Sequence, residues 1–128
     1  MNPDPTRPSE PEINPQWKWH YKALMRLNGR LLKEHEQRRR DINASLLESH
    51  KDPADTAADN SERDIFFAEL AMERNSLEEI EAALQRIRKG TYGICEISGK
   101  PISPDRLRAI PWTRFCRESA PRGERRKA

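Results

Sequence analysis

Apolar residues in the first half of the chain recur at helical spacing. No proline interrupts residues 16–50, and helix-forming residues dominate this segment. Its apolar positions predict a helix with one buried stripe: Trp17, Tyr21, Leu24, Leu31, Ile42 and Leu46. Three polar residues occupy expected apolar positions in the middle of the stripe: Asn28, His35 and Arg38. Asn14 and Pro15 predict the helix start, with asparagine as the N-cap and proline at the first helical position.

A second helical pattern follows a break in the chain. Proline disfavours helical geometry in the residue before it, so Pro53 ends the first helix. Asp52 as N-cap, with the carboxylate of Asp55 three positions later, predicts a new start. Ser61 with Asp64 supplies a second start signal. The apolar stripe of this helix consists of Phe66, Leu70, Leu77, Ile80, Leu84 and Ile87.

Two helices of roughly 35 residues joined by a tight turn predict an antiparallel hairpin, with arms about 50 Å long. Glu73 is the polar position in the second stripe, and Gly90 supplies the helix stop. Such a hairpin buries little surface and needs an anchor at its open end. Residues 91–119 contain apolar side chains for one: Tyr92, Ile94, Ile97, Ile102, Leu107, Ile110, Trp112 and Phe115. Glycines and prolines, including Pro104, supply turns between them.

Composition agrees with long exposed helices and a small core. Of the 128 residues, 34% are hydrophobic and 35% are charged, and the formal net charge is only +3. We interpret the basic runs 38–40 and 125–127 as a solvated face and tail. Prolines and acids near the N-terminus lead us to expect no export signal, and the sequence has no apolar run of membrane-spanning length. With two cysteines, we therefore expect a cytoplasmic, reduced protein without membrane contact.

The two cysteines occupy half of a metal-binding pattern. Cysteines at positions 98 and 119 would complete C-x2-C-x17-C-x2-C, a structural-zinc signature. The chain has Cys95 and Cys116 with Ser98 and Ser119. A neutral hydroxyl is a poor zinc ligand, because structural sites use thiolate or imidazole. The spacing therefore indicates a finger-like fold, while the residue types predict a vestigial site without metal.

Residues 86–96, 99–102, 106–107, 110–112 and 115–116 closely resemble the zinc-finger segment of the DksA/TraR family. The hairpin ahead of them, with its turn at 52–57, is similar to the long DksA-like members of this family. The resemblance covers residues 17–119. The implied fold is mainly α: a long antiparallel two-helix coiled-coil hairpin with a small zinc-finger-like globular domain at its open end.

The expected organisation has four parts. Residues 1–14 form a flexible N-terminal tail, and residues 15–89 form the coiled-coil hairpin with its tip near 51–58. Residues 90–120 form a degenerate finger domain, and residues 121–128 form a basic C-terminal tail.

The resemblance implies a non-enzymatic regulator of bacterial transcription. Members bind RNA polymerase directly, without sequence-specific DNA contacts, and insert the coiled coil into its secondary channel. DksA-like members act with guanosine tetraphosphate in the stringent response. The family's tip motif D-x-x-D-x-A falls on Asp52, Asp55 and Ala57. We expect these residues to act on the polymerase and the chain to be a monomer.

Two departures from the family narrow this expectation. Ser98 and Ser119 remove two metal ligands, so we expect no zinc and no other cofactor; packing and serine hydrogen bonds replace the metal. His20, His35 and His50 lie too far apart on one helix to substitute. The family's alarmone contacts are basic, and the matching positions here cannot neutralise a phosphate: Glu79, Ile110 and Ala120. We expect weak or no dependence on guanosine tetraphosphate.

Three alternatives remain. A Gre-like factor also places tip carboxylates near the polymerase metal and promotes transcript cleavage. A nucleic-acid-binding finger would use a basic face formed by Lys100, Arg106, Arg108, Arg114 and Arg117. An inert coiled-coil scaffold would leave the turn at 52–57 unexplained. An enzyme is not expected, because the chain has no paired nucleophile and base, no phosphate loop and no complete metal site.

Overall fold

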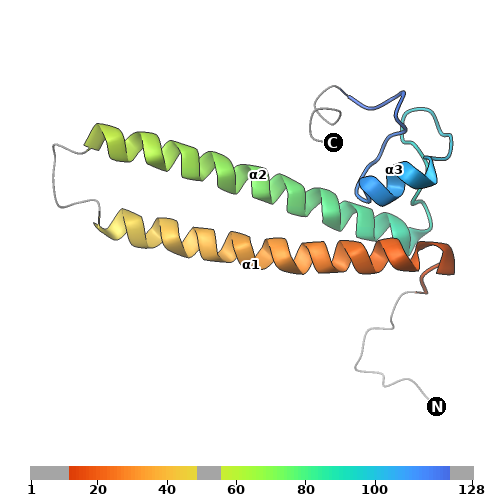
Figure 1. Cartoon of the computed structure of the whole chain (residues 1–128), viewed down its shortest axis with the longest axis horizontal. Coiled ribbons are helices and arrows are strands. Elements are labelled where there is room, and N and C mark those ends of the chain that lie inside the picture. Colours follow the sequence, from red (N-terminus) through yellow and green to blue (C-terminus); the bar gives the residue numbers. More distant parts are fainter. Residues whose placement is uncertain (1–11, 49–55, 122–128) are drawn as a thin grey trace, which may run out of the picture. The chain divides into compact units, whose positions relative to one another are not determined.

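A computed structural model describes residues 12–48 and 56–121 of the chain, with the backbone alone for 56–59. Its helices are η1 (Pro15–Trp17), α1 (Lys18–Glu48), α2 (Thr56–Lys89) and α3 (Pro104–Ala109). The only pairing of extended backbone in these residues is an isolated bridge between Ile94 and Pro101. The fold is mainly α, with a two-helix hairpin and a small finger-like domain, as the sequence predicts (Figure 1).

The start of the first helix follows the predicted capping chemistry. The Asn14 side chain accepts a hydrogen bond from the backbone N–H of Gln16 at 3.0 Å. Pro15 opens the η1 turn, where its missing N–H costs nothing. The η1 turn leads directly into α1.

The chain divides into two units. One combines Met1–Leu24 with Ala82–Ala128 and is called the finger unit below. The other, Met25–Glu81, is called the shaft unit. No helix in the described residues is long and apolar enough to cross a membrane.

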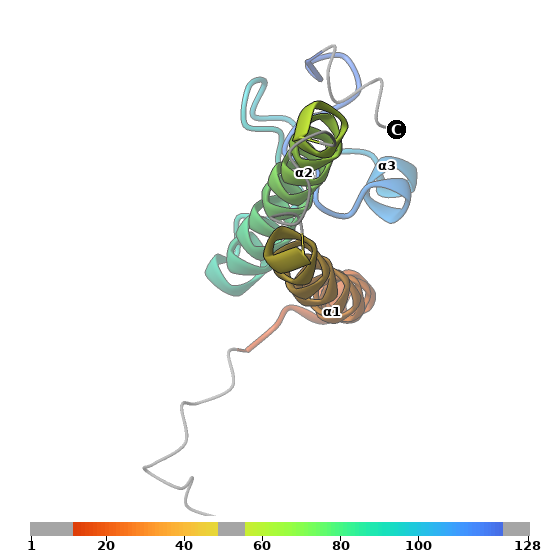
Figure 2. The same cartoon turned by 90° about the vertical axis from the view of Figure 1, so that its left-hand side faces the viewer.

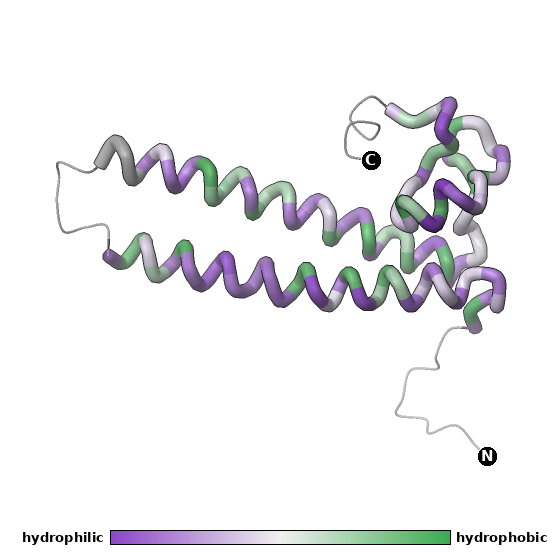
Figure 3. Tube along the Cα trace, in the orientation of Figure 1, coloured by the Kyte–Doolittle hydropathy of each residue, from purple (hydrophilic) through white to green (hydrophobic). Residues whose placement is uncertain are grey.

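The shaft unit consists of segments of α1 and α2 that lie side by side (Figures 1 and 2). Ile42 and Ile80 are buried, with 4% and 2% of their surface exposed. Other members of the two predicted stripes are half-buried: Leu31, Leu46, Phe66, Leu70 and Leu77. Residues 33–41 contain no apolar side chain, and this run is the hydrophilic stretch of α1 in Figure 3. The apolar contact between these helix segments is therefore narrow.

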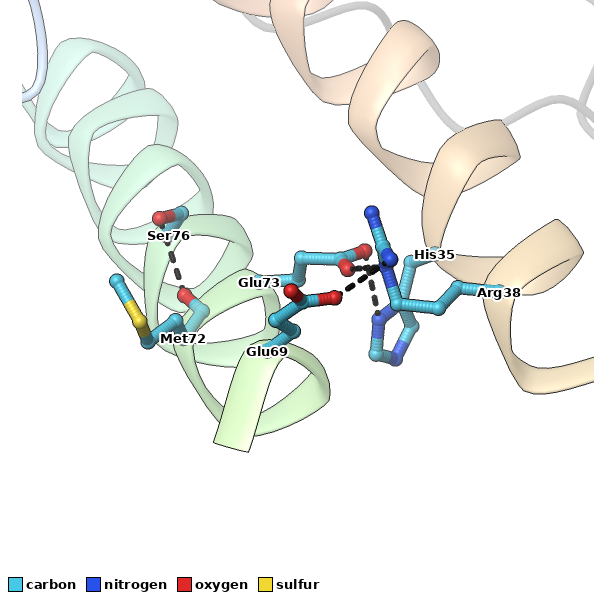
Figure 4. Close-up of polar contacts among 6 residues, drawn as sticks. All are labelled: His35, Arg38, Glu69, Met72, Glu73 and Ser76. Carbon is cyan, nitrogen blue, oxygen red and sulfur yellow. Dashed lines mark hydrogen bonds and ion pairs between the residues drawn. The ribbon is translucent and has the colours of Figure 1, made fainter. Parts of the chain in front are cut away.

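A polar cluster occupies the interrupted part of the stripes (Figure 4). Arg38 on α1 bridges two carboxylates one turn apart on α2, with Nη1 2.7 Å from Glu69 and Nε paired with Glu73. His35 is buried, and its Nδ1 lies 3.4 Å from the other carboxylate oxygen of Glu73. Directional polar contacts thus replace apolar packing where the sequence places Arg38, His35 and Glu73 in the stripes.

The finger unit contains a denser core than the shaft unit. Its buried apolar side chains come from the beginning of α1, the end of α2 and the segment after α2: Leu24, Ala83, Leu84, Ile87, Tyr92, Ile102, Leu107 and Ile110. Trp17 packs against Gly93, where a Cβ would lie 2.9 Å from the indole ring. Gly93 also has a φ of 87°, a backbone conformation that side chains disfavour. A glycine is therefore required at this contact.

Two features of the finger unit differ from the prediction. Ile94 and Ile97, expected among the anchoring residues, are 46% and 65% exposed because they lie on the bridge and in the following turn. Helix α3 was not predicted. It begins with Ser103 as N-cap, whose side chain accepts from the Arg106 N–H, and with Pro104 at the first position.

Candidate functional site

The first half of the vestigial site is a tight turn at Cys95. The backbone N–H of Gly99 donates to the Cys95 carbonyl at 2.9 Å, and Gly99 has the positive φ, 72°, that this turn requires. The N–H of Cys95 donates to the Lys100 carbonyl at 2.9 Å. The N–H of Ser98 points to the Cys95 sulfur, 3.4 Å away. This turn holds its cysteine as a zinc-binding turn would.

The second half of the vestigial site is a turn at Cys116, which contacts the first half. The N–H of Ser119 donates to the Cys116 carbonyl at 3.1 Å. The Cys116 thiol donates to the Ser119 hydroxyl at 3.2 Å. The Ser98 hydroxyl lies 3.7 Å from the Cys116 sulfur and joins the two turns. The four residues singled out by spacing therefore lie together in the folded chain.

The environment of Cys95 favours its thiolate. Its side chain is 1% exposed, and burial raises the pKa of a thiol. Hydrogen bonds from the Ser98 hydroxyl and from nearby backbone N–H groups outweigh burial and lower the pKa of Cys95 from 9.0 to about 5. The donors that stabilise a metal-bound thiolate are thus present without the full ligand set.

The donor atoms do not fit a structural zinc site. The site has two thiols, of Cys95 and Cys116, and the hydroxyls of Ser98 and Ser119 both contact the Cys116 sulfur. Structural zinc takes four thiolate or imidazole ligands, and a neutral hydroxyl does not replace them. Within the described ranges, no group of three or more His, Cys, Asp or Glu side chains is arranged to hold a metal ion.

Hydrogen bonds to backbone carbonyls constrain the finger segment, residues 90–120. Arg106 donates through Nε to the Phe115 carbonyl at 2.9 Å. Arg86 at the end of α2 donates through Nη2 to the carbonyls of Trp112 and Thr113, at 3.2 and 3.3 Å. Buried Tyr92 donates to the Pro111 carbonyl at 2.8 Å, and burial raises the pKa of this phenol. These contacts come from several sides and do not depend on a metal.

The basic side chains expected to form one face have different surroundings. Arg106 is engaged with the finger backbone, and Arg114 pairs with Glu96 at 3.3 Å. The guanidinium of Arg108 lies over the Trp19 ring, 4.9 Å from its centroid. Lys100 and Arg117 are exposed.

The predicted polymerase-contacting tip is only partly within the described residues. Asp52 and Asp55 lie outside them. Ala57 lies in the first turn of α2, where the backbone alone is described. The role of these three residues stays a prediction.

The positions that match the family's alarmone contacts have different environments. Ile110 and Ala120 are both buried, each 7% exposed, and Glu79 is half-buried on α2. Two of the three positions therefore belong to the interior of the finger unit. None of them presents a cation.

An aromatic cluster around His20 was missed by the sequence reasoning. The His20 ring meets Trp17, Trp19 and Tyr92 at centroid distances of 5.2, 5.1 and 5.7 Å. Burial, and secondarily the charge of Arg108, lower the pKa of His20 below its usual 6.5. The closely spaced aromatic residues at 17–21 are the available signal, but the predicted helical stripe includes only Trp17 and Tyr21 of them.

Residues 90–125 match the family model described as prokaryotic dksA/traR C4-type zinc finger. An uncharacterised protein of Aquifex aeolicus is 56% identical over 50 residues, which are 39% of this chain and 34% of that protein. An RNA polymerase-binding transcription factor DksA of Caulobacter vibrioides is 36% identical over 80 residues, 62% of this chain and 56% of that protein. The chain thus spans about a third and about half of these curated relatives.

The fold is similar to a solved structure over most of its length. Transcription factor DksA2 from Pseudomonas aeruginosa matches with a TM-score of 0.75 and 29% identity. The match covers 88% of this chain and 85% of that chain. The resemblance inferred from the sequence is therefore confirmed in both the finger motif and the helical hairpin.

Proposed function

We propose that the chain is a bacterial transcription regulator of the DksA/TraR family that binds RNA polymerase, because residues 90–125 match the family model of the dksA/traR C4-type zinc finger. The observation that carries the proposal is the coincidence of this finger with a hairpin similar to DksA2 over 88% of the chain. The proposed factor is a cytoplasmic, metal-free monomer. It enters the secondary channel of the polymerase and modulates initiation without catalysing a reaction.

The proposed acting groups are the carboxylates of Asp52 and Asp55, with Ala57 beside them. Two acids in the connection between long helices suit a pore that contains catalytic metal and cationic side chains, because opposite charges attract strongly where water is excluded. The helices then position the carboxylates, and the finger unit supplies further binding surface.

Weak or absent dependence on guanosine tetraphosphate is part of the proposal. A phosphate-binding position needs a cation or a free donor. Ile110 and Ala120 are buried apolar side chains, and Glu79 carries a negative charge. Support for this part comes from the side chains at these three positions. Transcription assays with and without the alarmone test it, and strong synergy would contradict it.

The direct test of the proposal measures binding and initiation separately. RNA polymerase is titrated with wild-type chain, Asp55→Asn, and the matched control Asp64→Asn on the exposed surface of α2. The same proteins are then added to promoter-initiated transcription reactions. All three are expected to bind alike, while Asp55→Asn alone loses its effect on initiation. Absence of wild-type binding contradicts the proposal. Cleavage of the transcript in stalled complexes would instead indicate a Gre-like activity.

A further inference from the structure

The finger unit contains two arginine–aromatic pairs that differ in their surroundings. Arg88 lies over Tyr21, 5.7 Å from the ring centroid, and donates to its hydroxyl at 3.2 Å. Both side chains are half-buried, so this pair is part of the packing. Arg108 lies over Trp19 at 4.9 Å, but Trp19 is 47% exposed and Arg108 is exposed as well.

The Arg108 guanidinium lies over the Trp19 ring while its N–H groups stay available. No hydrogen bond or ion pair to Arg108 occurs within residues 12–48 and 60–121. Asp105, one turn earlier on α3, does not pair with it. A guanidinium that rests on an aromatic ring is already oriented. Two of its parallel N–H groups, called the Arg108 fork below, can donate to both oxygens of one carboxylate. Binding such an anion therefore requires little further loss of side-chain freedom.

The surface around this pair is both cationic and apolar. Lys22, one turn along α1 from Trp19, is exposed, and it too has no ion pair among the described side chains. The exposed part of the indole adds apolar area beside the charges. Tryptophan and arginine are the residues most enriched among those that dominate protein–protein binding energy. Trp19 also meets buried His20 edge-on, but this contact leaves 47% of the Trp19 surface exposed.

We propose that Trp19 and Arg108 form a docking surface for an acidic segment of a protein partner, in which a carboxylate beside an apolar side chain binds the Arg108 fork. The carboxylate pairs with the guanidinium, and the apolar neighbour covers the exposed indole. A single-stranded nucleic acid fits less well, because it needs a free aromatic face for stacking and a track of cations. Arg108 covers one face of Trp19. Identifying the partner as RNA polymerase rests on the proposed function.

The test uses the full chain and substitutions that separate charge from geometry. Arg108→Lys keeps the charge and removes the fork, and Trp19→Ala removes the stacking platform. Binding to core RNA polymerase is expected to weaken about fivefold and about tenfold, respectively, within the range of such contacts. Arg74→Lys, on an exposed arginine of α2, is the matched control and is expected to bind as wild type. Melting temperatures identify variants that lose affinity only because the finger unit unfolds.

Two further probes separate failure of this inference from failure of the proposed function. Poly-L-glutamate is expected to bind wild type more tightly than Arg108→Lys, and an oligo-dT strand is expected to show no such difference. If poly-L-glutamate shows the difference but polymerase does not bind, the docking surface stands and the proposed function falls. If both folded variants bind polymerase and poly-L-glutamate as wild type does, the inference is overturned. If the variants lose affinity only for oligo-dT, the inference is overturned and the surface binds nucleic acid instead.

Discussion

The finger unit and the shaft unit differ in the side chains that they bury and in the contacts that these side chains make. Among the side chains that the structure describes, four of the five largest fully buried ones belong to the finger unit, and one, Ile80, belongs to the shaft unit. The four are Leu24, Leu84, Leu107 and Cys95. The finger unit adds hydrogen bonds from Arg86 and Arg106 to backbone carbonyls of the finger segment. The shaft unit has a narrow stripe interrupted by the cluster of Arg38 with Glu69 and Glu73.

This difference predicts that the finger unit keeps its form with two serines at the ligand positions. Apolar burial and carbonyl-directed hydrogen bonds constrain the finger segment from several sides, so the loss of two thiolates removes one constraint among many. The shaft unit has a narrow apolar stripe, so we expect each of its polar pairs to account for a larger share of the interaction between its helices.

Restoring the missing ligands is expected to have the largest effect. Ser98→Cys with Ser119→Cys places four thiols together at the vestigial site. Structural zinc binding contributes about 10–16 kcal/mol to the folding of isolated fingers. We expect stoichiometric zinc, measured by elemental analysis, and a higher melting temperature. Wild type and Ser98→Cys alone are expected to lack tight zinc. Stoichiometric zinc in the wild type, or none in the double variant, would show that the site geometry differs from that described.

Two glycines provide a matched comparison between the units. Gly93→Ala combines a φ of 87° with a Cβ 2.9 Å from Trp17, and is expected to destabilise the chain by about 2–4 kcal/mol. Gly29→Ala places a methyl group in open space within α1, and is expected to stabilise by about 0.5–1 kcal/mol. Urea unfolding measures both. Similar effects of the two substitutions would contradict the assignment of Gly93 to a packed contact.

Disrupting the polar cluster is expected to destabilise the shaft unit by less than Gly93→Ala destabilises the chain. Glu73→Gln removes the charge that faces Arg38 and His35. The Arg38 side chain is 39% exposed, so solvent screening limits the cost to about 1–2 kcal/mol. Amide hydrogen exchange within 25–48 and 60–81 is expected to accelerate, with little change in 90–121.

A matched control and a rescue test this interpretation. Glu78→Gln, on the exposed surface of α2, is expected to leave exchange unchanged. Arg38→Met combined with Glu73→Leu is expected to recover stability, because apolar pairs often replace buried ion pairs. Continued acceleration in the double variant would show that the specific charges, and not the contact between the helices, stabilise the shaft.

The smallest expected effect is a pH dependence specific to the finger unit. Because the pKa of His20 is lowered in the folded chain, its contribution to stability is complete above the unfolded value of 6.5 and is lost as pH falls. The slope contributed by His20 is at most about 1.4 kcal/mol per pH unit.

His20→Gln isolates this contribution from other titrating groups. The lowered pKa of Cys95 also makes stability fall as pH decreases towards about 5, but Cys95 is present in both proteins. The difference in urea midpoint between wild type and His20→Gln is therefore expected to change between pH 7.5 and 5.5. A constant difference across this range would contradict neutral burial of His20.

Much of the fold follows from local sequence signals. The two apolar stripes predict both long helices, and Asn14 with Pro15 predicts the first cap. The Cys-x2-Ser spacing predicts which four residues lie together. Helix α3 was missed although Ser103, Pro104 and Asp105 form a start signal, because its six residues are too few to show a period.

Contacts between distant segments could not be predicted in this way. Three features depend on how the residues after α2 pack against the helix ends within the finger unit. They are the exposure of Ile97, the contact of Trp17 with Gly93 and the position of Arg108 over Trp19. Neither propensity nor spacing contains that information. For the same reason, the spacing of Cys95 and Cys116 predicts a shared site but not the thiol–hydroxyl contacts that join its turns.

The most direct test of the proposed function is the lifetime of open promoter complexes formed by bacterial RNA polymerase at a stable-RNA promoter. At concentrations that saturate the polymerase, wild-type chain is expected to shorten this lifetime without added alarmone, and Asp55→Asn is expected to bind but leave it unchanged. An unchanged lifetime with bound wild type, or equal shortening by Asp55→Asn, would contradict action through the acidic tip.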